Sequence, residues 1–238
     1  MFIANYRLKS LVQKAAMAAR LPLGYAQAHP YSGLQERARS ATLDFISEQM
    51  PEAIAFDTPR ELMGHALSLV TVDGLIAEFG VNEGGTVSFI AKKNAGRTVH
   101  GFDSFEGLPE DWSGNKMHAG YFNRNGQLPR VPSNVVLHAG WFDKSLPKFL
   151  DEHAGPAAFL HVDCDLYSST VTIFGNFGPR IVEGTVIVFD EYFNYPNWQH
   201  HEHKAFEEFK RTSGLTFRYI AYSIQQIAVV AEKRSDPN

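Results

Sequence analysis

Acidic residues stand at the ends of several apolar segments, where their side chains could bind ligands or take up protons. Asp103 ends the segment VHGFD, and Asp163 and Asp165 follow AAFLHV. Asp190 and Glu191 follow VIVF in the same way. Clustered carboxylates of this kind can hold a divalent cation, accept hydrogen bonds from hydroxyl groups or act as a general base.

The segment EFGVNEGGT, residues 78–86, places a glycine-containing turn after an apolar stretch. A dinucleotide-binding turn needs glycine at its first, third and sixth positions, but the third position counted from Gly80 is Asn82. This absence argues against NAD or FAD, because the middle glycine lets the backbone approach a pyrophosphate. Glu78 would repel a pyrophosphate and attract an ammonium group. S-adenosylmethionine carries an ammonium and a sulfonium and no phosphate, so the segment predicts this cofactor.

Asp103 lies 23 positions after Gly80. At the end of the second strand of a nucleotide-binding fold, an acid at this distance suits the two hydroxyls of a ribose. We therefore expect Asp103 to bind the cofactor ribose. The alternative is that Glu78 and Asp103 serve only as caps of their strands.

Further along the chain, four features are weaker candidates. Trp141, which follows the third strand together with His138, would either stack on the adenine or belong to the core. Asp143 would cap the following helix or hold the adenine amine. The segment HHEH, residues 200–203, resembles a metal cluster, but a helix turns its middle histidine away from the other two, so a polar face at a substrate mouth is favoured. The long loop 104–134, with its aromatic residues, could close over a substrate.

From residue 74 onward, apolar segments alternate with helical patterns. Strands are expected at 74–79, 98–103, 135–138, 157–163 and 184–189, and helices at about 84–94, 145–153, 168–182 and 199–212. The chain ends with LTFRYIAY and QQIAVVAEK, two strands joined by a short turn. Residues 34–69 again indicate helices, with Pro51 and Pro59 as breakers.

This order predicts an α/β fold. We expect a Rossmann-like, doubly wound and mostly parallel seven-stranded sheet with an antiparallel C-terminal hairpin, because continuous apolar strands are typical of a parallel sheet covered on both faces. A helical arm or lid is expected over residues 1–65, and the nucleotide-binding domain over 66–238. Ligands of such sheets bind beyond the carboxyl ends of the strands, which is where the acids stand.

The N-terminal segment differs from the rest of the chain. Residues 1–35 contain four basic residues and no Asp or Glu, and apolar residues between 8 and 19 recur at helical spacing. A transit peptide or a membrane-surface helix would have this character. The segment is Ala-rich and has few interfacial anchors, so a helix packed on the body or on a second subunit is favoured. We therefore expect a homo-oligomer.

Composition narrows the class of protein. The chain has 238 residues, is 44% hydrophobic and carries a net charge of −4, which gives no reason to expect a nucleic-acid partner. No apolar run reaches the roughly 18 residues that a membrane span needs. Cys164 is the one cysteine, which excludes an internal disulfide, and its apolar surroundings predict a buried, inert thiol. A reducing, cytoplasmic setting and no membrane partner are expected.

Three segments resemble the macrocin O-methyltransferase family of class I S-adenosylmethionine-dependent enzymes. They are EFGVNEGGT, GFDSFEGLPEDW and VDCDLYSST followed by IVEGTVIVFDEY, and the resemblance covers roughly residues 60–230. It implies methylation of a hydroxyl on a small molecule, notably on sugars of natural products. It also implies cofactor contacts by five residues: Glu78, Gly80, Gly84, Asp103 and Ser104.

The resemblance further implies a divalent-cation site, with Mg²⁺ as the expected ion. Its ligands would be Asp165, Asp190 and the residue after Asp190. The family commonly has Asp-Asp-Tyr at this point, whereas this sequence has Asp190-Glu191-Tyr192. Glutamate can still bind a cation, but its longer side chain shifts the ion.

Methyl transfer explains why acids are needed. An aliphatic hydroxyl resembles water, with a pKa of about 15.7, and ionising it at pH 7 would cost roughly 12 kcal/mol. A divalent ion offsets part of this cost by stabilising the alkoxide. Asp163 and Asp165 are two residues apart and would point to the same face of the sheet, but a twist at the strand end could separate them, so either could be a ligand or the general base. Helix capping is the alternative role for these acids.

Two other classes of function are possible for the same sequence. The first is a dinucleotide-dependent oxidoreductase, against which Asn82 argues. The second is a catalytically inactive protein that binds the cofactor in the same fold. The clustered acids argue against it, because they have a chemical use only if a reaction occurs.

Overall fold

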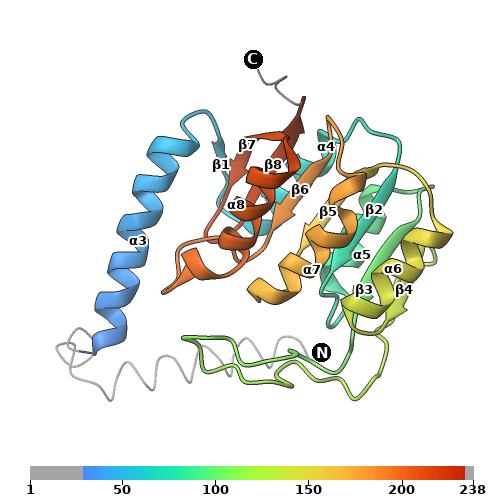
Figure 1. The fold of residues 1–238 in the computed structure, drawn as a ribbon, viewed down its shortest axis with the longest axis horizontal. Coiled ribbons are helices and arrows are strands. Elements are labelled where there is room, and N and C mark those ends of the chain that lie inside the picture. The colour runs from blue at the N-terminus through green and yellow to red at the C-terminus, as the bar shows by residue number, and fades with distance from the viewer. Residues whose placement is uncertain (1–28, 234–238) are drawn as a thin grey trace.

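The computed structural model of the chain describes residues 29–233. Its centre is one eight-stranded sheet in the order β1-β7-β8-β6-β5-β2-β3-β4 (Figure 1). The strands are β1 (Ile54–Ala55), β2 (Leu75–Phe79), β3 (Val99–Asp103), β4 (Val135–Ala139), β5 (Ala157–Val162), β6 (Val186–Phe189), β7 (Thr216–Tyr222) and β8 (Ile227–Glu232).

The predicted mostly parallel sheet with a terminal hairpin is confirmed. Strands β2 to β6 pair in parallel, and β8 runs antiparallel to both β6 and β7. Every residue of β5 and β6 is buried, as expected for strands covered on both faces. The sheet has one strand more than predicted, because β1 pairs in parallel with β7. This strand has only two residues, which is too short for a strand pattern to be recognised in the sequence.

Helices cover both faces of the sheet. They are α3 (Pro30–Gln49), α4 (Pro59–Ser68), α5 (Gly85–Lys93), α6 (Phe142–Glu152), α7 (Tyr167–Phe177) and α8 (Glu202–Ser213), with short 3-10 turns at 178–180 and 198–200. Helices α4 and α5 contribute to one apolar cluster and α6 and α7 to the other. Helix α8 packs beside α7 on that second face (Figure 1).

The helix boundaries differ slightly from those expected. Helix α6 begins three residues earlier than predicted, directly after Trp141. Helix α8 begins three residues later, because residues 198–200 form a separate 3-10 turn. Helix α4 begins with a complete capping box between Thr58 and Glu61, which satisfies its first backbone N–H groups.

The N-terminal region is described from residue 29 onward. Helix α3 packs against the body through Ala38 and Thr42, which are buried. The predicted boundary between arm and domain, at residues 65 and 66, falls inside α4. The basic segment before residue 29, with its expected helix, lies outside the described residues. Within residues 29–233, no helix is long and apolar enough to cross a membrane.

Candidate active site

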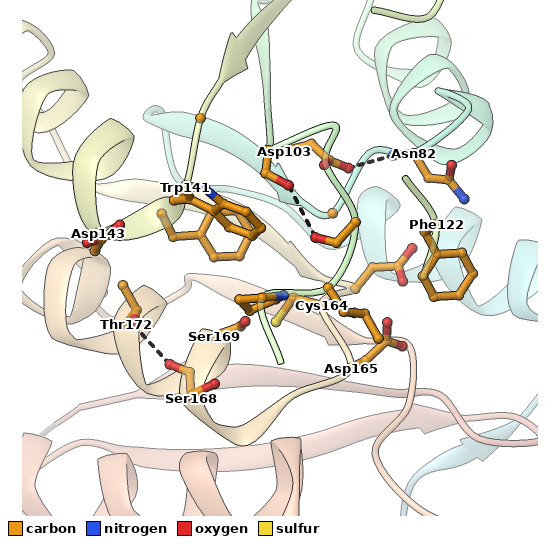
Figure 2. A pocket seen from close by; sticks show the side chains of 18 of the residues that line it. Asn82, Asp103, Phe122, Trp141, Asp143, Cys164, Asp165, Ser168, Ser169 and Thr172 are labelled. Carbon is orange, nitrogen blue, oxygen red and sulfur yellow. Dashed lines mark hydrogen bonds between the residues drawn. The ribbon is translucent and has the colours of Figure 1, made fainter. Parts of the chain in front are cut away.

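A cavity of about 550 Å³ lies at the carboxyl edge of the sheet, where the strand order reverses between β2 and β5. Open α/β sheets bind ligands at this point, because the following helices diverge to opposite faces. Figure 2 shows the side chains around it. The lining includes seven residues that were predicted from the sequence: Gly80, Asp103, Ser104, Trp141, Asp163, Asp165 and Glu191.

The turn after β2 depends on glycine for two different reasons. Gly80 has a φ of +96°, and a Cβ atom there would overlap the carbonyl oxygen of Asp163 at the end of the neighbouring strand. Gly84 has a φ of +77° and is the N-cap of α5, where no side chain caps the helix. Gly84 does not line the cavity, so its role is to let the chain turn into α5.

Asp103 lines the cavity, but its carboxylate is already bound by the backbone. Its Oδ2 atom accepts hydrogen bonds from the N–H groups of Val81 and Asn82, both at 2.8 Å. Its Oδ1 atom accepts one from Phe105 at 2.7 Å. A carboxylate offers about four acceptor positions, so about one remains for a ribose hydroxyl rather than the two expected. Ser104 lies beside it, and its hydroxyl donates to the carbonyl of Gly107 at 3.2 Å.

Glu78 is buried behind the cavity and does not line it. Its Oε1 atom lies 3.2 Å from Nδ1 of His161 on the adjacent strand β5, and its Oε2 atom has no hydrogen-bond partner. Burial raises the pKa of Glu78, and the contact with His161 partly opposes this effect. The sequence alone did not single out His161, because it is one polar residue inside an apolar strand.

Three carboxylates meet at one end of the cavity. Asp163, Asp165 and Glu191 offer oxygen atoms that all lie within 4.8 Å of one another. Asp165 has a φ of +64°, a left-handed conformation that is uncommon for a residue other than glycine. The Oε2 atom of Glu191 is buried without a partner. The predicted trio of Asp165, Asp190 and Glu191 is not among the groups that meet this distance criterion within residues 29–233.

The close approach of these acids disfavours their charged forms. Burial, together with the charge of Asp190, raises the pKa of Asp165 to about 7, although a hydrogen bond with Glu191 opposes the shift. Burial and the charge of Asp190 also raise the pKa values of Asp163 and Glu191 well above their usual range. A bound cation would relieve this repulsion, and a carboxylate that titrates near neutral pH suits a general base.

Asp190 points toward a different partner. Its Oδ1 atom accepts a hydrogen bond from Nε2 of Gln226 at 3.3 Å and lies 4.0 Å from Nε2 of His161. It does not line the large cavity. Asp190 and Glu191 are consecutive, but only the Glu191 side chain lies at the large cavity.

Glu202 is a further acid of the site that sequence reasoning missed. This residue is fully buried at the start of α8, and its Oε1 atom accepts a hydrogen bond from the backbone N–H of Cys164 at 3.3 Å. Burial and the charge of Asp165 raise its pKa well above its usual range. In the sequence it appears only as the acid within HHEH, so nothing there indicates that it packs beneath the strand-end acids.

Two of the three histidines of HHEH lie among aromatic rings, whereas His200 is exposed. His203 packs against Trp198 and Phe45, with ring centres 4.7 and 5.4 Å apart, and burial lowers its pKa to about 4. His201 packs against Trp112 of the long loop. These contacts support neither a metal cluster nor a polar face.

Cys164 is a buried, free thiol whose pKa is raised well above its usual range by burial, which agrees with the predicted inert state.

The opposite end of the cavity is aromatic. Trp141 and Phe142 line it at the start of α6, and Asp143 follows them with a side chain that is 58% exposed. No side chain caps this helix start, so the capping role considered for Asp143 is absent. Phe122 and residues 107–109 of the long loop line the cavity from another side.

Comparison with known proteins identifies the class of domain. Residues 77–192 match the family model described as a methyltransferase domain. This segment of the chain is similar to methyltransferase domains. The matched range contains every acid of the cavity that was predicted from the sequence. The predicted class of enzyme, an S-adenosylmethionine-dependent methyltransferase, is thereby confirmed for this domain.

One curated relative of this methyltransferase domain comes from Streptomyces olivaceus. It is the 8-demethyl-8-(2,3-dimethoxy-alpha-L-rhamnosyl)-tetracenomycin-C 4'-O-methyltransferase, which is 31% identical over 145 residues. The match spans 51% of this chain and 54% of the relative, so the chain spans about half the length of that protein. The match supports O-methyl transfer, while membership of the macrocin family stays a prediction.

Two solved structures share the fold. CalS11, a calicheamicin methyltransferase, has a TM-score of 0.60 at 20% identity, with 84% of this chain and 91% of that chain covered. The O-methyltransferase NovP has a TM-score of 0.58 at 22% identity, with 73% and 79% covered. These likenesses confirm the Rossmann-like methyltransferase fold.

Proposed function

We propose that the chain is an S-adenosylmethionine-dependent O-methyltransferase of the macrocin type, acting on a hydroxyl group of a sugar or another natural-product-like small molecule. The observation that carries this proposal is the convergence of Asp163, Asp165 and Glu191 at one end of a cavity whose other end is aromatic. We also propose a cytoplasmic setting and a homo-oligomer, as expected from the sequence.

The lining of the cavity favours one orientation of the cofactor. The aromatic end, with Trp141 and Phe142, is suited to stacking on adenine, since a flat apolar ring gains most from such a surface. Asp103 and Ser104 also line the cavity and can accept a ribose hydroxyl. The methyl group then points toward the three carboxylates, where a nucleophile has to be activated.

The carboxylates supply the base. As the acceptor oxygen attacks the methyl carbon, its proton passes to Asp165, and the bond between that carbon and sulfur breaks. The products are a methyl ether and S-adenosylhomocysteine. A base with a pKa near 7 is matched to neutral pH. The cavity holds the two reactants in line, which removes much of the entropic cost of the step.

A divalent cation such as Mg²⁺ fits the same residues. Asp163, Asp165 and Glu191 provide the hard oxygen atoms that Mg²⁺ prefers, and the partnerless Oε2 atom of Glu191 is an acceptor without a proton donor. When bound, the cation would supply positive charge that stabilises a developing alkoxide.

The similarity to the Streptomyces relative favours a deoxysugar hydroxyl as the acceptor. The relative acts on a rhamnosyl group according to its name. The aromatic side chain of Phe122 beside the polar carboxylates provides the combination of surfaces that a sugar ring uses.

A transfer assay tests the proposed function. The purified chain is incubated with S-adenosylmethionine, Mg²⁺ and a panel of rhamnosylated aromatic compounds, and products are followed by mass spectrometry. We expect the mass gain of one methyl group on an acceptor, together with S-adenosylhomocysteine. Each active acceptor is compared with its deoxy analogue, which should remain unmodified. Cofactor binding without transfer to any hydroxyl acceptor would instead indicate an inactive binding protein.

A further inference from the structure

Glu202, the first residue of α8, is a buried acid whose contacts lie outside the cavity. Its exposed fraction is 0%, and it does not line the cavity. Within residues 29–233 it also belongs to neither of the groups of acids and histidines whose atoms lie close enough to share an ion. Burying a carboxylate costs free energy unless hydrogen bonds compensate for the lost water. The groups that bind this carboxylate therefore indicate its role.

The regular hydrogen bonds of β5 and β6 end at the same level of the sheet. Asp163 and Asp190, each one residue past its strand, still donate their N–H groups to carbonyls of neighbouring strands at 2.9 Å. The next N–H groups belong to Cys164 and Glu191, and within residues 29–233 neither of them donates to another backbone group. A buried N–H group without an acceptor is costly, so the acceptor has to come from a side chain or from water.

The carboxylate of Glu202 supplies this acceptor. Its Oε1 atom accepts a hydrogen bond from the N–H of Cys164 at 3.3 Å. The backbone of Glu191 contributes a second, weaker hydrogen bond, and both bonds oppose the rise that burial causes in the pKa of Glu202. One side chain of α8 thus binds the chain beyond two neighbouring strands.

Helix α8 holds this carboxylate in place. Phe206, about one turn further along the helix, packs its ring against that of Phe189, the last residue of β6, with ring centres 4.9 Å apart. Both rings are fully buried. Close packing of this kind fixes the helix on the sheet, and a group on a rigid helix positions its partners more precisely than a group on a loop.

The turn that Glu202 binds carries one of the three clustered acids. The N–H of Cys164 donates to Glu202, and its carbonyl accepts a hydrogen bond from the N–H of Leu166 at 2.6 Å. The backbone is therefore bound on both sides immediately before Asp165. Asp165 itself is left-handed, with a φ of +64°, and its carboxylate meets the other two acids of the cluster. The position of that carboxylate depends on the turn that Glu202 holds.

We propose that Glu202 is a positioning residue for methyl transfer: its carboxylate binds the N–H groups beyond β5 and β6 and thereby sets the backbone from which Asp165 and Glu191 reach the cavity. The inference rests on the proposed function. Without this acceptor the N–H of Cys164 would be unpaired, and the turn would shift toward water or another partner. A misplacement of about 1 Å at a reacting group can slow a reaction by about 100-fold.

Two variants of Glu202 separate its role as a hydrogen-bond acceptor from its charge. Glu202→Met keeps the length of the side chain but has no oxygen atom, so the N–H of Cys164 loses its acceptor. Glu202→Gln loses the charge but keeps an oxygen atom that can accept this bond. Both are assayed with S-adenosylmethionine, Mg²⁺ and the rhamnosylated compound that the wild-type chain methylates fastest. We expect kcat to fall by about tenfold or more in Glu202→Met and by about threefold or less in Glu202→Gln.

Cofactor binding should not change in either variant, since Glu202 does not line the cavity. The KM for S-adenosylmethionine and the calorimetric affinity for S-adenosylhomocysteine are expected to stay within about twofold of the wild type. A residue that only stabilises the fold would instead lower kcat and cofactor affinity together.

Thr185→Val is the matched control. Thr185 is also 0% exposed, and its hydroxyl donates to the carbonyl of Ala157 at 2.7 Å, so it joins β5 and β6 at their opposite ends. The control should lower the melting temperature and leave kcat unchanged. Should Glu202→Met not fold, Glu202→Asp takes its place, because its shorter side chain cannot reach the same N–H group.

Three results would overturn the positioning role while leaving the proposed function intact. They are an undiminished kcat in the folded Met or Asp variant, a loss in Glu202→Gln equal to that in Glu202→Met, and a parallel loss of kcat and cofactor affinity. A wild-type chain that transfers no methyl group would overturn the proposed function itself.

Discussion

The carboxylate of Asp103 accepts a hydrogen bond from the backbone N–H of Asn82 at 2.8 Å, so the end of β3 fixes the loop that follows β2. Val81 donates to the same oxygen atom. Gly80 and Asn82 of this loop line the large cavity. An acid expected to bind a ribose is therefore also the residue that holds the binding loop in shape.

Asp103→Ala should consequently reduce both stability and cofactor affinity. Three backbone N–H groups lose their acceptor, and because water can replace part of these bonds we expect a loss of about 2 kcal/mol in the free energy of unfolding. Affinity for S-adenosylhomocysteine should fall by about tenfold. Urea denaturation and calorimetry measure the two effects, with Glu106→Ala as the neighbouring control, because Glu106 is exposed and does not line the cavity. An unchanged unfolding free energy would show that these bonds do not hold the loop.

Cation binding is expected to stabilise the fold through Glu191. In the absence of a cation the three carboxylates repel one another, so a ligand that binds only the folded chain should raise the melting temperature as its concentration rises. We expect Mg²⁺ to do so in the wild type and not in Glu191→Gln, which keeps the shape but loses the charge. Differential scanning fluorimetry over a range of MgCl₂ concentrations measures this.

The control for this titration is Glu183→Gln, since Glu183 is an exposed acid in the turn before β6. It should respond to Mg²⁺ as the wild type does. An equal Mg²⁺ effect in Glu191→Gln and in the wild type would show that the ion acts elsewhere. Turnover that persists in EDTA would show that the carboxylates work as a base without a cation.

The strand-end acids could be predicted because parallel strands bring their carboxyl ends to one edge of the sheet. Continuous apolar runs located β2, β3, β5 and β6, and the residue after each run was therefore a candidate. Which of these acids lie next to one another could not be predicted from the sequence. Asp163 joins Asp165 and Glu191, while Asp190 turns toward Gln226. The backbone at Asp165 is left-handed, so the regular alternation of a strand, on which the expectation rested, does not continue there.

Contacts between distant segments could not be predicted from local patterns. Glu202 reaches Cys164 across 38 positions, and His161 reaches Glu78 across 83. Glu202 stands among histidines in HHEH, and His161 is one polar residue in an apolar strand, so neither was singled out. Strand β1 was missed because it is only two residues long, and its partner β7 lies far away in the sequence.

The pH dependence of stability should report a histidine pair at the sheet edge away from the acids. Nδ1 of His100 lies 3.1 Å from Nε2 of His138, and burial, with the charges of His138 and His153, lowers the pKa of His100 to about 4. The unfolded chain then binds the proton more readily between pH 6.5 and 4, so this contribution to stability falls as the pH drops.

Comparison of wild type with His100→Asn isolates this effect from the buried acids, whose raised pKa values act in the opposite direction. Between pH 8 and pH 5 the wild type should lose about 2 kcal/mol relative to the variant. Urea denaturation at each pH measures the difference. A difference between the two chains that is constant across this range would mean that His100 titrates alike in the folded and unfolded chain.

The start of α3 exposes apolar side chains that could contact a second subunit. Thr42 and Phe45 of α3 pack on the body, where Phe45 contacts the rings of Tyr192 and Tyr219. Nearer the start of the helix, Tyr31 is 54% exposed and Leu34 is 48% exposed. Large apolar side chains exposed together on one helix end favour a protein partner. We expect a homodimer or larger assembly in which residues 1–50 take part.

Light scattering at micromolar concentration checks this expectation, and Leu34→Asp should shift the chain toward the monomer, because burying an unpaired carboxylate in an apolar contact is unfavourable. Val136→Asp is the matched control: Val136 is 44% exposed on β4, the edge strand at the other end of the sheet from β1. It should leave the mass unchanged. A monomeric wild-type chain, or equal effects of the two variants, would contradict a role of α3 in assembly. Cofactor titrations on the Leu34→Asp monomer would then show whether each subunit binds S-adenosylhomocysteine alone.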